Sequence, residues 1–439
     1  MENLNNPIEK PVIRKRPVNL LGLLIIYLLC TVLLYAFGPI DWKTHNSLQT
    51  YGLIFIYIIA LALGGWSVKN KFSKQEKHQT GKLDWFYRNY TWIAIFCIIM
   101  RVLSIERILI RYGYNNIFQI IKIIITDYGD LYFAESSSMG SGIWAIHSLI
   151  SLIVSPLTFL FIPLSIVLFS KLKKGQKILA IIGIFLWTVY NLSQGTNIGF
   201  FTIIVVVGIS FLFREKKQKL KPYKDKETNA KKIFALLFIA VLFLFAFGFS
   251  MSNRMGSSIN FSQIGENSVN KNNWLYNALP DNFKNLLIWF DFYICQGYYG
   301  MSLATEVAWE PMFGMGFSRW LCLELDGILP FGVYELTYPY RIEAAGFAWG
   351  SSANWHTAFT WFANDLGFAG VILLMFLIGR LFNAVYYDVI KYKNPTDIGL
   401  LLLLVQLIVF IPCNNYIFSN SVLLFPFFAY LLLRGLRKL

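Results

Sequence analysis

Long apolar runs, separated by short charged segments, dominate the chain from end to end. Several of these runs reach about 20 residues, which is the length of an α-helix that crosses the hydrocarbon core of a bilayer. The pattern predicts an all-α polytopic membrane protein with about ten spans. The predicted spans are residues 18–37, 51–68, 90–105, 149–169, 178–192, 198–213, 234–250, 368–387, 398–411 and 417–433.

The composition agrees with this pattern. Hydrophobic residues make up 56% of the chain and charged residues only 14%, whereas a soluble domain carries about 25% charge. These values exclude a soluble enzyme, a disordered chain and a fibrous protein. We therefore expect residues 1–439 to form a single membrane-embedded unit.

The basic residues orient the predicted helices. Of the 39 Lys and Arg residues, 28 lie in the two tails and in the loops that the predicted spans place on the same side as the tails. Because cytoplasmic loops carry the excess of Lys and Arg, both termini are predicted to be cytoplasmic. The net charge of +15 then meets the anionic lipid of the bilayer, and a nucleic-acid partner is not expected.

Catalytic and cofactor motifs are sparse. The five cysteines form no CxxC pair, and the four histidines form no ligand pair. The sequence contains no Walker loop, no GxGxxG, no HExxH and no GxSxG. No metal and no cofactor are therefore predicted. A disulfide between Cys295 and Cys322 is allowed, because both lie in a predicted external loop.

Two predicted external segments carry most of the candidate chemistry. The larger is residues 251–366, between the seventh and eighth spans, and it holds seven of the 13 tryptophans. Aromatic planes suit the apolar faces of sugar rings, and they equally suit a membrane interface. Residues 286–303 within it are predicted to form an interfacial or half-buried helix. The smaller segment is residues 106–148.

Arginines gather where the third predicted span meets the smaller segment. Arg101 lies inside the span, where it needs a partner or a water-filled cavity. Arg107 and Arg111 share a face if the helix continues outward, because they are four residues apart. Guanidinium groups offer bidentate donors to phosphate oxygens, which favours a diphosphate site. Arginines that reach for the outer interface are the alternative.

Polar residues also precede the eighth predicted span. Asp365 lies near the start of that helix, where a carboxylate caps free backbone amides. It is predicted to be either such a cap or a base. His356 is the only histidine in the larger loop, and it is either a base near neutral pH or an ordinary loop residue.

These residues carry a resemblance to a known family. Residues 354–357 (NWHT) and 365–370 (DLGFAG) resemble the late motif of bacterial oligosaccharide repeat-unit polymerases, the Wzy-type polymerases of O-antigen and capsule. Upstream, residues 296–300 (QGYYG) and 313–316 (FGMG) are similar to the aromatic-glycine helix and G-x-G layout of that family. The chain departs from the family at residues 194–197 (QGTN), where such polymerases often have Gly-x-Arg-Ser/Thr.

The resemblance implies a GT-C-like fold and a metal-independent glycosyltransferase in the bacterial cytoplasmic (inner) membrane, with its active site facing the periplasm or exterior. Such an enzyme polymerises oligosaccharides linked to undecaprenyl diphosphate, in the synthesis of lipopolysaccharide O-antigen or capsule. The lipid-linked donor, the lipid-linked acceptor and the bilayer are the implied partners, and a chain-length regulator and a flippase are further ones. No nucleotide is needed, because the diphosphate bond supplies the driving force.

Candidate site residues follow from this chemistry. Arginines are expected to bind the leaving diphosphate, and two or three of them to converge. The candidate catalytic residues are His356 and Asp365. The diphosphate-binding candidates are Arg107, Arg111, Arg254, Arg319 and Arg341, and the other substrate-binding candidates are Glu343, Asn354, Trp355 and Thr357.

Three alternatives remain open. An O-antigen ligase of the same superfamily would transfer the glycan to a lipid A acceptor. A flippase would carry the lipid-linked oligosaccharide across the membrane, and it needs no aromatic outer loop of 116 residues. A structural or regulatory membrane partner would catalyse no reaction.

Overall fold

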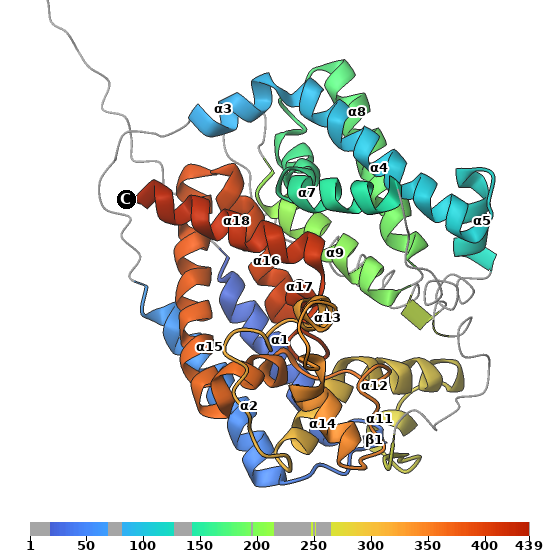
Figure 1. Cartoon of the computed structure of the whole chain (residues 1–439), viewed down its shortest axis with the longest axis vertical. Helices are drawn as coiled ribbons and strands as arrows, with labels where there is room; N and C mark the ends of the chain where they lie inside the picture. The colour runs from blue at the N-terminus through green and yellow to red at the C-terminus, as the bar shows by residue number, and fades with distance from the viewer. Residues whose placement is uncertain are drawn as a thin grey trace, which may run out of the picture.

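The computed structural model shows a mostly α-helical protein (Figure 1). It describes residues 18–68, 81–126, 143–194, 196–214, 247–248, 251 and 265–438. The helices are α1 (Leu20–Phe37), α2 (Ser47–Trp66), α3 (Gly81–Arg88), α4 (Tyr90–Tyr112), α5 (Ile117–Thr126), α7 (Ile143–Leu168), α8 (Lys174–Ser193), α9 (Asn197–Leu212), α11 (Trp274–Asn277), α12 (Asp281–Ala304), α13 (Arg319–Asp326), α14 (Tyr338–Ala344), α15 (Ala358–Tyr392), α16 (Pro395–Phe410), α17 (Tyr416–Ser419) and α18 (Ser421–Lys438). The smaller elements are the 3-10 helix η2 (Tyr334–Leu336) and the strands β1 (Ile40–Asp41) and β2 (Ser268–Val269).

Five of the described helices are long and apolar enough to cross a membrane, namely α1, α2, α7 from Ile146 onward, α8 and α15. Two further described helices, α9 and α16, are apolar but shorter. Large apolar side chains are exposed on the outer faces of these helices, as at Leu33, Ile59 and Phe185. Such faces are stable in lipid, where a helix satisfies its own backbone polar groups. The chain is therefore an all-α membrane protein.

The helices α4 and α18 coincide with two more of the predicted spans, and each carries at least three charged residues. The helix α4 continues past the predicted span through Arg107 and Arg111 to Tyr112, which is the condition under which these two arginines share a face. The predicted span 234–250 lies outside the described residues, apart from residues 247–248.

The helix α15, which has 35 residues, packs closely against α2 because glycines remove side chains from the contact. A Cβ atom on Gly64 would lie 1.9 Å from the carbonyl oxygen of Phe376. A Cβ atom on Gly379 would lie 2.0 Å from the carbonyl oxygen of Leu61. Small residues at such crossings let helix backbones approach each other in membrane proteins.

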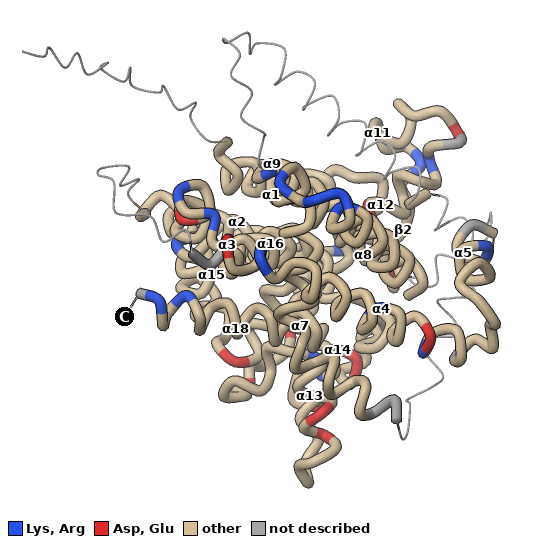
Figure 2. The backbone as a smooth tube through the Cα atoms, turned by 90° about the horizontal axis from the view of Figure 1, so that it is seen from above, with Lys and Arg blue, Asp and Glu red and all other residues tan. Residues whose placement is uncertain are grey.

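At one end of the bundle, charged residues connect the ends of α15, α16 and α18. Arg434 donates to Asp397 at 2.8 Å and to Asp388 at 2.6 Å, and Arg437 donates to Asp397 at 2.7 Å. Asp397 is 1% exposed and Arg434 is 4% exposed. We call this end, marked by these four residues, the basic end. It lies toward the top of Figure 1, and Figure 2 looks down on it and shows Lys and Arg at the ends of several helices.

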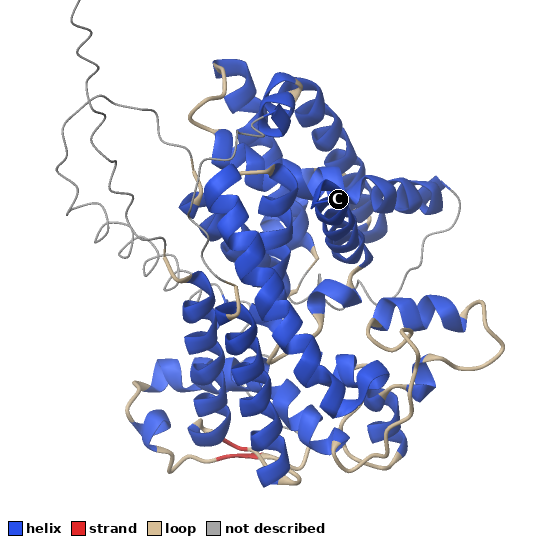
Figure 3. Ribbon diagram, turned by 90° about the vertical axis from the view of Figure 1, so that its left-hand side faces the viewer, coloured by secondary structure: helices blue, strands red, loops and turns tan. Residues whose placement is uncertain are grey.

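The opposite end, which we call the loop end, is built largely from residues 265–357. Here β1 pairs antiparallel with β2 (Figure 3). Asp291 of α12 is fully buried, and it accepts hydrogen bonds from the amide of Ile40 at 3.0 Å and from Trp42 Nε1 at 3.3 Å. Burial raises the pKa of Asp291 to about 7. The helix predicted at residues 286–303 is thus part of α12. The carboxyl group of Asp291 on this helix binds the segment that follows α1, at Ile40 and Trp42.

The helix α15 consists of two parts joined at a kink at Gly367. The second part begins directly after Gly367, as predicted for the span that starts at residue 368, and the first part, from Ala358 with Thr357 as its N-cap, was not predicted. Asp365 lies two residues before the kink, and its Oδ1 accepts from the amides of Gly314 and Gly316, so it caps a turn of another segment and not the amides of α15. The backbone turns at Gly367, where φ is 62°, a conformation that glycine adopts without strain. Asn364 and Asp365, which precede this turn, form hydrogen bonds with residues of other segments.

Candidate functional site

The motif segments, which lie far apart in the sequence, pack together at the loop end. The carbonyl of Gly297 in α12 accepts a hydrogen bond from the amide of Thr357 at 3.4 Å. A Cβ atom on Gly300 would lie 2.7 Å from His356 Nδ1. The two glycines of α12 therefore allow the chain before α15 to lie directly on this helix.

The residues on either side of this contact have structural partners. The amide of Trp355 donates to Gln296 Oε1 at 3.1 Å, and its ring packs edge-on against Tyr293 with the centroids 4.4 Å apart. Asn354 Oδ1 accepts from the amide of Gly350 at 3.0 Å. Two of the predicted substrate-binding residues thus hold the shape of the loop.

His356 is enclosed between α12 and this loop. It is 1% exposed, and neither ring nitrogen meets the geometry of a hydrogen bond with the described residues. Burial lowers the pKa of His356 to about 3, against the effect of the Gly300 backbone and with a smaller contribution from Arg319. The imidazole is therefore neutral at pH 7, and one of its nitrogens is a proton acceptor.

Asp365 organises the turn at residues 313–316. Its Oδ1 accepts hydrogen bonds from the amide of Gly314 at 2.8 Å and from the amide of Gly316 at 3.0 Å. Gly314 has a φ of 88°, which explains the glycine at this position. Asp365 Oδ2 is buried without a hydrogen-bond partner among the described residues. The carboxylate thus connects α15 to the turn that precedes α13 and keeps one oxygen unpaired.

Asn364, the neighbour of Asp365, was not among the predicted site residues. Its Nδ2 donates to the carbonyl of Gly316 at 2.8 Å, and its Oδ1 accepts from the amide of Tyr338 at 2.8 Å. It therefore ties α14 and the same turn to α15. Its position beside the motif at residues 365–370 was the one sequence signal for this role.

Two of the predicted diphosphate arginines have protein partners. Arg341 pairs with Glu310 at 2.9 Å, and Arg107 donates to Ser148 Oγ at 2.6 Å. Glu343, which was predicted to bind substrate, accepts a hydrogen bond from the amide of Ser351 at 2.7 Å. Hydrogen bonds from the Ser351 side chain and backbone lower the pKa of Glu343.

Arg319 differs from these two. Its Nε is buried without a hydrogen-bond partner among the described residues, and its guanidinium carbon lies 5.9 Å from the ring centroid of Tyr334. It also lies near enough to His356 to affect the pKa of that residue. The side chain of Arg111 and the whole of Arg254 lie outside the described residues. The predicted convergence of two or three of these arginines stays a prediction.

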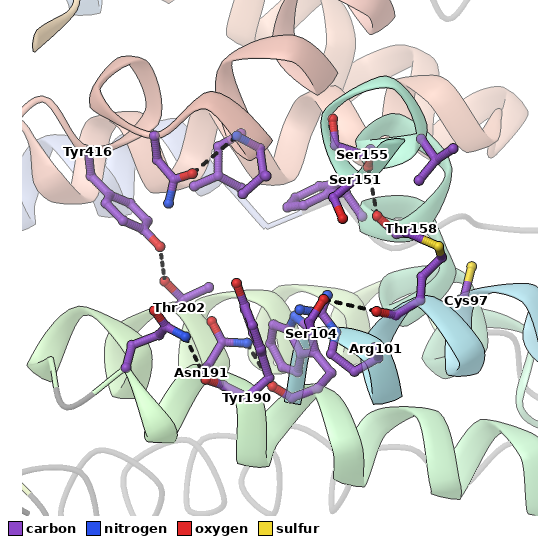
Figure 4. Close-up of a pocket in the computed structure, with 18 residues that line it drawn as sticks. Cys97, Arg101, Ser104, Ser151, Ser155, Thr158, Tyr190, Asn191, Thr202 and Tyr416 are labelled. Atoms are coloured by element: carbon purple, nitrogen blue, oxygen red, sulfur yellow. Dashed lines mark hydrogen bonds between the residues drawn. The ribbon is translucent and has the colours of Figure 1, made fainter. Parts of the chain in front are cut away.

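A polar pocket lies inside the bundle, between α4, α7, α8, α9 and the segment α17–α18 (Figure 4). Its volume is about 160 Å³. Arg101 enters it from α4, with its guanidinium carbon 4.2 Å from the ring centroid of Tyr190. Hydroxyl and amide groups line it from Ser104, Ser151, Ser155, Thr158, Tyr190, Asn191, Gln194, Thr202, Tyr416 and Asn420. This is the kind of cavity that Arg101 was predicted to need, and we call it the Arg101 pocket.

A second pocket, which we call the apolar groove, runs along α15 and is completed by α16, α17 and α18. Its volume is about 400 Å³. Along α15 its lining begins at Phe362 and Asp365 and continues through leucines to Leu381, and phenylalanines such as Phe427 line the other side. A carboxylate at the loop end thus borders a long apolar surface.

Among the described residues, no group of three or more His, Cys, Asp or Glu side chains is placed to hold a metal ion. Cys295 and Cys322 are buried free thiols, so the allowed disulfide between them is not formed.

Comparison of the chain with protein-family models, curated proteins and solved structures finds no match.

Proposed function

We propose that this membrane protein is a metal-independent glycosyltransferase that polymerises oligosaccharide repeat units carried on undecaprenyl diphosphate. Ten spans place both termini and the basic end in the cytoplasm, and the loop end faces the periplasm or exterior. The enzyme makes O-antigen or capsular polysaccharide in the bacterial inner membrane.

The observation that carries this proposal is the packing of the motif segments against one another. Residues 296–300, 313–316, 354–357 and 365–370 carry the resemblance to the polymerases, and they are joined through Gly297, Gly300 and Asp365. Segments with a shared function are expected to meet in space, and this packing supports the proposal.

The reaction transfers a growing glycan from its lipid diphosphate to a hydroxyl of the incoming unit. The hydroxyl oxygen attacks the anomeric carbon, the bond from that carbon to the diphosphate oxygen breaks, and the hydroxyl proton passes to a base. The unpaired Oδ2 of Asp365 offers a carboxylate oxygen for this role, and His356 offers a neutral imidazole, which its burial and its pKa of about 3 make a weak base. Arg319 supplies positive charge toward the leaving diphosphate.

The apolar groove suits the lipid part of these substrates. Its lining is apolar apart from Asp365 among the described residues, and it follows α15 away from the loop end. A polyprenyl chain in the groove would leave its diphosphate and sugar at the loop end, next to the motif segments.

The test is a gel of surface polysaccharide from a deletion strain that expresses the wild type or a variant. The variants are His356→Gln, Asp365→Asn and Arg319→Lys, and the control is Glu324→Gln, because Glu324 is exposed on α13. The proposal expects single repeat units in the deletion strain and a restored ladder with the wild type and the control. Loss of about 100-fold or more in one of the first two variants would identify the base.

Other results would contradict the proposal. Polymer that accumulates on its lipid carrier would indicate a ligase. Single units trapped on the cytoplasmic face would indicate a flippase, and an unchanged ladder in the deletion strain would exclude all three activities.

A further inference from the structure

The Arg101 pocket contains a cation without a matching anion. The guanidinium of Arg101 stacks on Tyr190, and the described residues that line the pocket include no Asp or Glu. A charge at this depth in a membrane protein is costly unless a partner or water compensates it. The stacking on Tyr190 contributes only part of that compensation, because a cation–π contact stabilises by about 0.5–2 kcal/mol.

The pocket has room for such a partner. Its volume of about 160 Å³ is well above the roughly 10–15 Å³ that one water molecule requires on the same measure. The labelled polar side chains come from several helices and face the same space (Figure 4). The pocket can therefore hold several waters or a small polar group such as a phosphate.

The guanidinium of Arg101, and not the hydroxyls of the lining as a group, favours an acceptor-rich ligand. Ser104 and Ser155 already donate their hydroxyl hydrogens to helix carbonyls. Thr202 donates to the hydroxyl of Tyr416 at 3.4 Å, which leaves the hydrogen of Tyr416 to donate elsewhere. The strongest donor is the guanidinium of Arg101, whose fork matches two oxygens of a phosphate group.

The pocket lies in the half of the bundle nearer the loop end. Ser151 is in the early part of α7, Gln194 directly follows α8, and Tyr416 begins the short α17 between α16 and α18. These three positions lie away from the basic end, where α16 begins and α18 ends. A lipid headgroup in the outer leaflet would approach the protein at this level.

We propose that the Arg101 pocket binds a phosphate-type oxyanion, held by the Arg101 guanidinium. The candidate sources are the diphosphate of a lipid carrier and a soluble phosphate or diphosphate. The assignment to a lipid carrier rests on the proposed function, whereas the oxyanion site itself does not.

The experiment measures ligand binding to the purified full-length chain in detergent. The probes are inorganic diphosphate, farnesyl diphosphate and farnesol, which lacks the phosphates. The variant Arg101→Gln removes the charge, and Arg101→Lys retains the charge but loses the fork. The matched control is Arg380→Gln, because Arg380 is also an arginine within a long apolar helix and contacts Ser67 at 3.2 Å.

We expect the wild type and Arg380→Gln to bind farnesyl diphosphate equally. Arg101→Gln is expected to weaken that binding about 10-fold to 100-fold, because it removes hydrogen bonds to a charged group, and Arg101→Lys is expected to lie between. Stronger binding of farnesyl diphosphate than of inorganic diphosphate assigns the site to a lipid headgroup. Equal binding of the two assigns it to a soluble anion.

The proposal is overturned if the folded wild type binds neither diphosphate, or if Arg101→Gln binds as the wild type does. It is also overturned if farnesol binds as tightly as farnesyl diphosphate. Size-exclusion profiles and melting temperatures show whether each variant is folded, and Arg101→Lys serves as the test if Arg101→Gln is not.

The binding experiment and the polysaccharide gel test the oxyanion site and the proposed function separately. Binding that depends on Arg101 without any polymerisation would contradict only the proposed function. A normal polysaccharide ladder in an Arg101→Gln strain, together with unchanged diphosphate binding, would contradict only the oxyanion site.

Discussion

Two arginines inside the bundle, Arg434 buried and Arg101 half-buried, have different environments for their positive charge. Arg434 at the basic end pairs with two carboxylates, from Asp388 and Asp397, and is almost fully enclosed. Arg101 in the Arg101 pocket has hydroxyls, amides and an aromatic ring around it, and no carboxylate among the described lining residues. The first arrangement joins three helices and is complete in itself, whereas the second leaves donors for a ligand.

The largest expected effect comes from breaking the ion pairs at the basic end. Asp397→Asn would leave Arg434 and Arg437 without their shared carboxylate in a buried site. Removing one partner of a buried ion pair typically costs about 3–5 kcal/mol of folding free energy. We expect much lower yield of folded protein and a clearly lower melting temperature, measured by size exclusion and thermal denaturation in detergent. Stability equal to that of Glu324→Gln, which changes an exposed carboxylate, would contradict this interpretation.

Close helix packing provides the second test, because it contrasts with the open Arg101 pocket. Gly64→Ala places a Cβ atom against the carbonyl oxygen of Phe376, where the separation would be 1.9 Å. We expect a loss of about 1–3 kcal/mol, since α2 and α15 must move apart. The control is Gly52→Ala on the same helix, where a Cβ atom meets nothing within 4 Å. The expectation fails if the two variants have the same melting temperature.

The third test concerns acid stability at the loop end. The folded pKa of His356, about 3, is below the value of about 6.5 for an unfolded histidine. The stabilisation from the neutral imidazole is therefore fully present above pH 6.5 and is lost as the pH falls toward 3. At pH 5 this loss amounts to about 2 kcal/mol. Melting curves from pH 7 to pH 5 should show a smaller acid loss for His356→Gln than for the wild type or His45→Gln, and parallel curves would contradict the buried position of His356.

The smallest effect on stability is expected at Arg101. In the absence of ligand, Arg101→Gln loses the contact with Tyr190 but also removes the cost of an uncompensated charge, so we expect a net change below about 1 kcal/mol. Added farnesyl diphosphate should then raise the melting temperature of the wild type and leave that of the variant nearly unchanged. A large loss of stability without ligand would show that Arg101 has a structural role like that of Arg434.

The sequence predicted the fold class well because lipid imposes a simple requirement on composition. Runs of about 20 apolar residues are a direct consequence of bilayer thickness, and most of the predicted spans are helices in the described structure. The part of α15 after Gly367 begins where it was predicted, but the helical part before Gly367 was missed, because Asn364 and Asp365 read as polar loop residues. Their partners are Gly314, Gly316 and Tyr338, and no local pattern reveals contacts at that sequence separation.

The candidate site was predictable only in part for the same reason. The motif glycines and Asp365 were identified from local spacing, and they do come together. The roles of the arginines depend on neighbours that are distant in the sequence, such as Glu310 for Arg341 and Ser148 for Arg107. Residue type shows which groups are able to bind phosphate, and only packing shows which of them already have a partner.

The sequence alone thus determined that the chain is an α-helical membrane protein, because hydropathy acts over adjacent residues and needs no tertiary information. It also indicated that Arg101 requires a partner or a cavity. The tertiary structure decided that this requirement is met by a polar pocket built from five parts of the chain, and that Arg434 has carboxylates instead. The physical reason is that the energy of a buried charge depends on the groups around it in space, which helix packing brings together from distant segments.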